Sequence, residues 1–352
     1  MSDDGRARTD AGMRFLVAAA SLVVVVAGLR AAAQVVLPFL VAVFFAVVSV
    51  PLMGWLQRWR VPRPLAVLCT MLSAVAVIGI LALVVGRSVN EFRFAAPRYQ
   101  TRLQSLLDSG LRLIEERGLP VQEWRSLDLV PVGGMFDVLG GALGAVASFA
   151  SNSFLVLLTV VFILMEAVGF SAKLRAAFGQ EAQLGQLERM TRQVQNYLVI
   201  KTAISAVTGV LVGLWVGALG LDFPLLWGLV AFILNFIPTL GSIFAAVPAV
   251  LLALVQFGPA RAGVIAVGYL GINVVFGNFV EPMLLGRRLG LSTLVVFVSL
   301  VFWGWVWGPV GMLFSVPLTM AIKIALENTT EFRWVAVMLD ANPGTLPPSR
   351  SS

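Results

Sequence analysis

Two long apolar segments carry the residues with the clearest chemical potential, because each is interrupted near its middle by proline and glycine. Residues 225–256 contain the stretch NFIPTLGSIFAAVP, and residues 291–326 contain WGPVGMLFSVP. A proline has no N–H to bond the carbonyl four residues earlier, so each break releases polar backbone. In hydrocarbon such backbone is tolerated only where it is buried in protein or lines a wet cavity. The carbonyls expected to be released are those of Leu234, Phe244, Trp305 and Leu313.

The same segments supply uncharged side chains that form hydrogen bonds. Asn235, Thr239 and Ser242 lie at the first break, and Thr319 lies near the second. Such groups suit an uncharged polar ligand or a partly dehydrated cation. The predicted substrate pathway consists of residues in and beside the breaks, namely Asn235, Pro238, Thr239, Gly241, Ser242, Asn273, Asn278, Glu281, Pro282, Gly308, Pro309, Gly311, Pro317 and Thr319.

Glu281 is the acidic residue that we expect nearest to a site. Asn273 shares its helical face and Asn278 lies one turn away, so the three form a polar stripe on an apolar helix. Carboxylates within a membrane usually face a cavity or pair with a partner. One that titrates near neutrality could couple a proton to transport. The alternative is a structural salt bridge to Arg287 or Arg288 at the cytoplasmic surface.

Other chemistry is largely excluded by what the chain does not contain. Glu166 ends a predicted span and allows the same two interpretations as Glu281, with Lys173 as a candidate partner. There is no histidine and only one cysteine, Cys69, which removes Ser-His and Cys-His catalysis and the common zinc sites. No aspartate lies within a predicted span, so a paired-aspartate protease is unsupported. We expect neither an enzyme nor a bound cofactor.

The elements that must position these residues are membrane helices. The chain has 352 residues, of which 59% are hydrophobic and only 12% charged, whereas soluble proteins have about half and a quarter. Several apolar runs reach the roughly 20 residues that a helix needs to cross a bilayer. They do not alternate as barrel strands do. The net charge of +7 lies largely beside these runs, which indicates topology and not nucleic-acid binding.

The predicted fold is therefore an all-α polytopic membrane protein with seven to eight membrane segments and a small helical insert. Arginines before the first span and at residues 58–63 would share the cytoplasmic side, which places the N-terminus in the cytoplasm. The predicted parts, in order, are a tail at 1–14, three scaffold spans within 15–86, an extracytoplasmic insert at 87–142, a fourth span at 143–168, a cytoplasmic amphipathic helix at 169–202, a transport core at 203–326 and a cytoplasmic tail at 327–352.

Charge placement suggests how the two broken segments, 225–256 and 291–326, enter the bilayer. If the first enters from outside and returns, the next span delivers Arg287 and Arg288 to the cytoplasm, and the second segment enters from there. Two such re-entrant hairpins that meet near the midplane are typical of secondary transporters with inverted repeats. The alternative is that proline and glycine merely kink packed helices.

Three motifs give the sequence a family resemblance. NFIPxxGS, VEPxLxGRRLGL and GPxGxxxxVP occur in this order from Asn235 onward. Together they resemble the autoinducer-2 exporter family (AI-2E family) of bacterial inner-membrane proteins. The motif positions carried over are Asn235, Pro238, Gly241, Glu281, Pro282, Gly308, Pro309, Gly311 and Pro317. The residue after Pro238, often aromatic in such proteins, is Thr239 here.

The resemblance implies a homo-oligomer, pentameric in form, that exports a small signalling molecule or exchanges a monovalent cation for protons. The opposed hairpins themselves lead us to expect that the two hairpins and the Glu281 helix form a mobile transport unit on a scaffold of the first spans, for which an elevator-like movement would fit. Two other functions stay open: an oligomeric channel, which would conduct without saturation, and a scaffold that transports nothing and binds a partner through its insert.

Overall fold

The computed structural model of the chain describes residues 3–116, 158–163, 165–166, 181–238, 240–285, 290–327 and 333–341. The regular structure within these ranges is helical, and it includes six helices long and apolar enough to cross a membrane. The prediction of an all-α polytopic membrane protein is therefore confirmed. The remainder of the insert and most of the fourth predicted span lie outside the described residues, as do Thr239, Lys173, Arg287 and Arg288.

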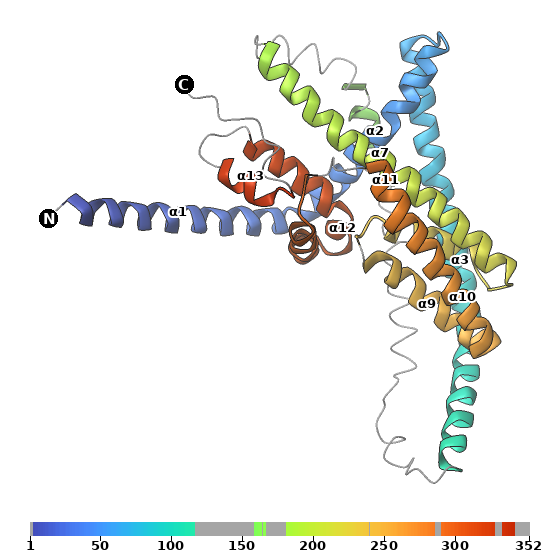
Figure 1. The fold of residues 1–352 in the computed structure, drawn as a ribbon. Helices are drawn as coiled ribbons and strands as arrows, with labels where there is room; N and C mark the ends of the chain where they lie inside the picture. The colour runs from blue at the N-terminus through green and yellow to red at the C-terminus, as the bar shows by residue number, and fades with distance from the viewer. Residues whose placement is uncertain are drawn as a thin grey trace.

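The N-terminal helices are α1 (Asp3–Ala31), α2 (Ala33–Arg58) and α3 (Arg63–Glu115). Helix α1 projects away from the other helices and joins them only at its C-terminal end (Figure 1). There the indole Nε1 of Trp307 donates a hydrogen bond to the carbonyl of Leu29 at 2.9 Å. Most of the apolar side chains of α1 are exposed, so in a bilayer this helix has its surface available to lipid or to another chain.

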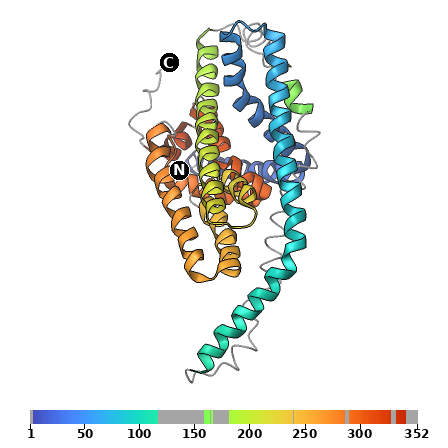
Figure 2. The same cartoon turned by 90° about the vertical axis from the view of Figure 1, so that its right-hand side faces the viewer.

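Two helices continue through positions where the sequence predicts a change of element. Helix α3 has 53 residues and passes the expected boundary at residue 86, and α7 (Glu181–Ala218) has 38 residues and passes the one at 202. A change from apolar to charged composition does not interrupt backbone hydrogen bonds, and α7 contains no proline. The far end of α3 consequently extends beyond the other helices (Figure 2).

The first broken segment folds into a hairpin of α8 (Pro224–Leu234) and α9 (Leu240–Phe257). Its two ends lie together, because the side-chain oxygen of Gln256 accepts a hydrogen bond from the backbone N–H of Asp222 at 3.2 Å. The prediction of a released carbonyl at Leu234 is wrong, since this oxygen accepts a 2.9 Å bond from the N–H of Ile237 in the turn. The turn is tight, and a Cβ atom at Gly241 would overlap the same carbonyl.

The second broken segment, α12 (Thr293–Glu327), is bent at Gly308, whose φ of 65° and ψ of −148° are accessible essentially only to glycine. Two hydrogen bonds join the arms: Ser299 Oγ donates to the carbonyl of Ser315 at 3.1 Å, and Trp303 Nε1 donates to Thr319 Oγ1 at 3.2 Å. Where α12 begins, the carbonyl of Gly290 accepts a 2.6 Å bond from Lys323 near its end. This segment too returns to the side from which it starts.

The two hairpins start at different levels along α7. The first follows the C-terminus of α7, whereas Leu291, just before the second, packs with Tyr197 and Leu198 near the middle of that helix, toward the N-terminal end of its apolar stretch Thr191–Ala218. Helix α2 lies between the hairpins: its Phe44 ring is 5.6 Å from the ring of Phe236 in the first and 5.7 Å from that of Phe314 in the second.

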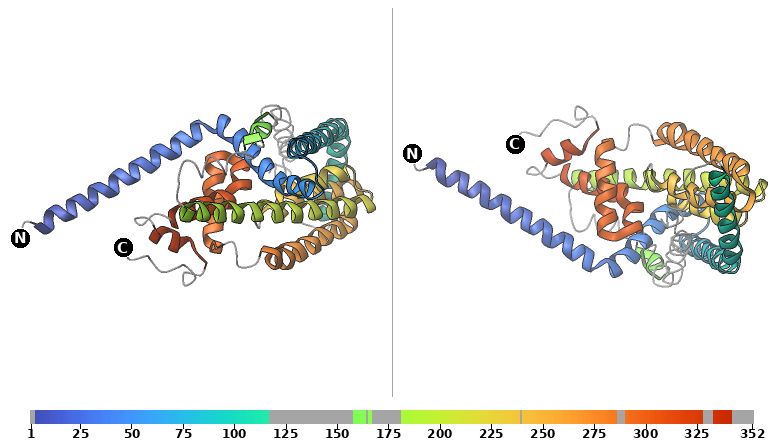
Figure 3. Two further views of the ribbon diagram at one scale, coloured as in Figure 1. Left: turned by 90° about the horizontal axis from the view of Figure 1, so that it is seen from above. Right: turned by 90° about the horizontal axis from the view of Figure 1, so that it is seen from below.

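The chain between the hairpins forms one long element beside α7, as the views from above and below also show (Figure 3). It comprises α10 (Pro259–Asn273), the π-helix η1 (Val274–Val280) and α11 (Glu281–Leu285). After the second hairpin, α13 (Arg333–Leu339) packs on α12. Helices α7, α8, α9 and α10 share the largest cluster of buried apolar side chains, which therefore holds the first hairpin in place.

Candidate functional site

A small cavity lies at the break of the first hairpin, between α7, α8, α9 and α10. Its volume is about 20 Å³, enough for about one water molecule. Five of the side chains around it are polar: Thr208, Asn235, Ser242, Tyr269 and Asn273. The structure thus brings together three residues of the predicted pathway and adds two that the sequence analysis did not identify.

Helix α7 contributes a polar face to this region. Lys201, Ser205 and Thr208 are spaced by four and three residues, which places them on one side of a helix. All three are buried. This spacing within an otherwise apolar stretch is the signal by which they could have been found from the sequence.

The break itself places Asn235 against that face. Asn235 is the residue at which α8 ends, and its amide Nδ2 donates a 2.9 Å hydrogen bond to Ser205 Oγ. Ser205 lies near the middle of the apolar stretch Thr191–Ala218, and the 11 residues of α8 measure about 16 Å, half of a hydrocarbon core. The break therefore lies at about half the depth of the α7 span.

Two hydroxyl groups at the cavity lack hydrogen-bond partners. Thr208 Oγ1 and Tyr269 OH are both buried, and neither has a partner among the described residues. Buried polar atoms are nearly always satisfied, and an exception in a native structure calls for an explanation. Because both atoms belong to residues that line the same cavity, they are available to a polar solute that enters it.

The predicted polar stripe of Asn273, Asn278 and Glu281 is divided by the π-helix. Asn273 lines the cavity, whereas Asn278 is exposed. Pro282 cannot donate a backbone hydrogen bond, and the N–H of Glu281 just before it bonds the carbonyl of Phe276, five residues back. The wider π turn changes the angle between successive residues, so Asn278, within η1, does not lie on the face by which Asn273 lines the cavity. Such π segments are frequent at functional sites.

Glu281 forms an ion pair with Lys201. Lys201 Nζ lies 2.6 Å from one carboxylate oxygen and 2.7 Å from the other, and only 3% of the Lys201 side chain and 22% of the Glu281 side chain are exposed. The partners expected from the sequence, Arg287 and Arg288, lie outside the described residues. In the structure the lysine one turn before Ser205 holds the carboxylate, which ties α11 to α7.

The other predicted pathway residues lie elsewhere. Gly308, Pro309, Gly311, Pro317 and Thr319 belong to α12, and Thr319 accepts the hydrogen bond from Trp303. The remaining ones are placed as follows: Pro238 and Gly241 form the turn of the first hairpin, Pro282 is exposed in α11, and Glu166 is exposed on the short described part of the fourth predicted span. In the described ranges, no three Asp, Glu, Cys or His side chains are grouped to hold a metal ion.

The known proteins to which this chain is similar are described as transport proteins. The family model described as AI-2E family transporter matches residues 19–331. The chain is 40% identical over 329 residues to the AI-2 transport protein TqsA of Escherichia coli strain K12, which covers 93% of this chain and 96% of that protein. It is 36% identical to the putative transport protein YhhT of the same strain, over 93% of this chain and 94% of that one. A putative transport protein of Haemophilus influenzae is 34% identical, over 93% of this chain and 96% of that one.

The ion pair generates a prediction about stability. Replacing Glu281 by Met leaves the buried ammonium group of Lys201 without its partner, which we expect to lower the free energy of unfolding by about 3 kcal/mol. Replacing Lys201 by Met should cost less, because the Glu281 carboxylate is partly exposed. The double variant should be more stable than the sum of the two changes implies. Thermal unfolding in detergent measures this, with Arg112→Gln on the exposed part of α3 as a neutral control. Additive effects would show that the two charges do not stabilise each other.

Proposed function

The chain belongs to the AI-2E transporter family, and we propose that it is a secondary transporter that exports a small polar molecule of the autoinducer-2 type. It is a multi-pass membrane protein of a transporter family and not an enzyme. The observation that carries the proposal is the polar cavity at the break of the first hairpin, in which two buried hydroxyl groups have no partner among the described residues. The name of the TqsA relative, an AI-2 transport protein, supports the choice of substrate.

The chemistry of the cavity favours an uncharged, hydroxyl-rich solute. Its polar lining consists of two hydroxyl groups from Thr208 and Tyr269, the Ser242 hydroxyl and two amides, and the nearby ionic charges of Lys201 and Glu281 neutralise each other. Hydroxyl and amide groups both donate and accept hydrogen bonds, which matches the hydroxyl and carbonyl groups of a small sugar-like molecule. Exchange of a monovalent cation for protons is the second candidate, because Glu281 supplies a carboxylate on the same path.

Transport requires the first hairpin to move against α7. The cavity has room for about one water molecule, so a larger solute fits only if the 2.9 Å contact between Asn235 and Ser205 opens. Helix α7 also holds α11 through the pair of Lys201 and Glu281. Proton or cation binding to Glu281 would weaken this pair and release α11 from α7. The two events together give an elevator-like step in which the hairpins and α10, η1 and α11 move as one unit.

The arrangement of the hairpins supports alternating access. Each broken segment has its two ends joined on one side, through Asp222 and Gln256 in the first and Gly290 and Lys323 in the second. The two sides lie toward opposite ends of the apolar stretch Thr191–Ala218 of α7. With the N-terminus in the cytoplasm, the first hairpin enters the inner membrane from outside and the second from the cytoplasm. The breaks then place polar groups at membrane depth where the surrounding helices cover them.

The projecting helix α1 supports self-association. Its apolar side chains are exposed along most of its length, and its contacts within the chain are confined to its C-terminal end. We propose that α1 and the helices after it form the scaffold of a homo-oligomer, pentameric in form, in which each chain has its own pathway. An oligomeric channel on the central axis is the alternative, and it would conduct without saturation.

The cavity hydroxyls provide the direct test of function. Thr208→Val and Tyr269→Phe remove groups that have no partner among the described residues, so stability should be unchanged or raised. If the groups bind solute, each change should slow transport roughly fivefold, the equivalent of one hydrogen bond worth about 1 kcal/mol. Saturable flux of autoinducer-2 in proteoliposomes measures this, with Asn278→Ala on the exposed face as the matched control. Unchanged flux in both variants would contradict the proposed site.

Glu281 provides a separate test of coupling. Glu281→Gln keeps an oxygen that can accept a bond from Lys201 but cannot take up a proton. We expect downhill flux to persist while transport driven by a proton gradient is lost. Glu281→Asp should retain a response to the gradient because it keeps a titratable carboxylate. Flux would be followed at several values of the imposed pH difference. Proton-driven transport by Glu281→Gln at the wild-type level would rule out Glu281 as the coupling group.

A further inference from the structure

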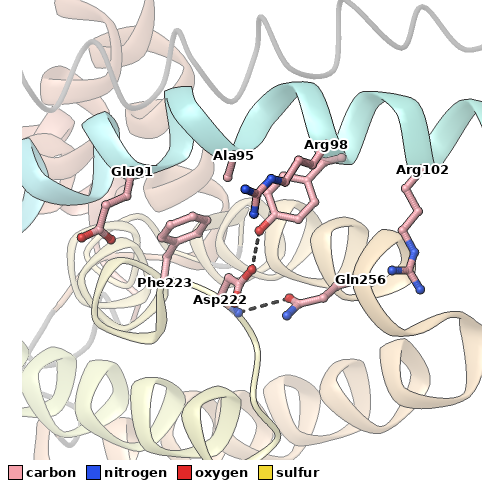
Figure 4. Close-up of a pocket in the computed structure, with 8 residues that line it drawn as sticks. Glu91, Ala95, Arg98, Arg102, Asp222, Phe223 and Gln256 are labelled. Atoms are coloured by element: carbon pink, nitrogen blue, oxygen red, sulfur yellow. Dashed lines mark hydrogen bonds between the residues drawn. The ribbon is translucent and has the colours of Figure 1, made fainter.

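A second, larger pocket lies far from the cavity of the first hairpin, where α3 leaves the apolar part of the molecule. Its volume is about 460 Å³, within the range of about 300–1,000 Å³ that is usual for sites of small ligands. Helix α3 forms one wall with Glu91, Arg98 and Arg102. The opposite wall comes from the loop between α7 and α8 and from the end of α9, as Figure 4 shows.

The pocket has a fixed frame. The Tyr99 hydroxyl donates a hydrogen bond to the carboxylate of Asp222. The rings of Phe92 and Phe223 pack edge to face, with their centroids 6.1 Å apart. Burial, together with the bond to Asp222, raises the pKa of Tyr99, so its hydroxyl remains a donor at neutral pH. The carbonyl of Asp222 accepts a 2.9 Å bond from the indole of Trp227. The wall opposite α3 is thus held by bonds that do not involve the arginines.

The two arginines of the pocket carry positive charge that no described residue pairs with. Arg98 and Arg102 are four residues apart on one face of α3, both are exposed, and neither guanidinium has a hydrogen-bond or ion-pair partner among the described residues. Paired guanidinium groups are suited to the planar, bidentate recognition of carboxylate and phosphate. The amide of Gln256 also lines the pocket (Figure 4); its Nε2 donates one 3.4 Å hydrogen bond to the carbonyl of Gly220 and keeps a second N–H.

The two carboxylates of the pocket do not cancel this charge where the ligand would bind. One oxygen of Asp222 is occupied by Tyr99. Glu91 lies at the other end of the pocket from Arg102, with Phe223 between them in the view of Figure 4. Arg98 lies between Glu91 and Arg102 in the same view and acts electrostatically on Tyr99, so positive charge extends from the middle of the pocket to its Arg102 end. A ligand with one oxyanion group fits this asymmetry better than a cation does.

We propose that this pocket binds a small molecule or headgroup through a phosphate group, with Arg98 and Arg102 as the phosphate ligands. Because Asp222 and Gln256 also join the two ends of the first hairpin, an occupied pocket holds those ends together. The site is separate from the cavity lined by Thr208 and Tyr269, so its failure would leave the proposed transport pathway unaffected. The phosphate can come from a soluble anion or from an anionic lipid, since α3 crosses here from the apolar to the polar zone.

The test uses the full chain in nanodiscs. Inorganic phosphate is titrated into the protein in zwitterionic lipid at constant ionic strength, and in a second arm phosphatidylglycerol is added to the lipid instead. Thermal stabilisation as a function of each probe gives the affinity. We expect saturable binding that is at least about tenfold weaker in Arg98→Gln/Arg102→Gln, a loss of about 1.4 kcal/mol. Arg112→Gln, further along the same helix, should bind as the wild type does.

The two arms distinguish the source of the phosphate. Saturable binding in zwitterionic lipid assigns the site to a soluble anion, and a response to phosphatidylglycerol alone assigns it to a lipid headgroup. Arg102→Gln by itself should give an intermediate loss in either case, and both arginines are exposed, so the variants should unfold at the wild-type temperature without ligand. Absence of saturable binding to both probes, or equal binding by the double variant, would overturn the proposal.

Discussion

Every polar group that these helices carry into hydrocarbon has to find a partner within the protein, and this constraint shapes both broken segments. At the first break the turn itself satisfies the carbonyl of Leu234, and Gly241 allows the backbone to pack against it. At the second, Gly308 adopts a conformation that other residues rarely reach, and the arms are joined through Ser299 and Trp303. Breaks closed in this way allow polar side chains to lie at half the depth of a membrane helix while the carbonyls of Leu234 and Ser315 have hydrogen-bond partners.

The polar side chains of the first break and of α11 are arranged against helix α7. One face of it presents the lysine that pairs with Glu281, the serine that accepts the bond from Asn235 and the threonine that lines the cavity. The first hairpin and the chain from α10 to α11 both contact this face, through Asn235 and Glu281 respectively. Two of the three buried polar side-chain atoms without a hydrogen-bond partner among the described residues, Thr208 Oγ1 and Tyr269 OH, lie at the point where these elements meet. That is where a solute would replace the missing partners.

The breaks were predictable from the sequence because proline and glycine act on their own backbone. Three residues of the predicted pathway, Asn235, Ser242 and Asn273, lie around one cavity in the structure. The role of Lys201 was not predictable, because its partner is 80 residues away and the contact depends on how α7 and α11 pack. Asn278 was misplaced since a π-helix does not follow the 3.6-residue period. The lengths of α3 and α7 were not predictable, because both helices continue through positions where the composition changes. Local chemistry was therefore predictable, whereas pairing between distant elements was not.

The central claim is that the first hairpin moves against α7 and so exposes the polar cavity to one side of the membrane at a time. Labelling of a cysteine placed at Ser242, in a chain whose only native cysteine is removed by Cys69→Ala, tests it most directly. An impermeant maleimide would be applied to either side of proteoliposomes under opposite gradients, with Arg112→Cys as a position of fixed exposure. The account predicts that the side from which Ser242→Cys reacts changes with the gradient. Reaction from one side only, at a constant rate under every gradient, would contradict it.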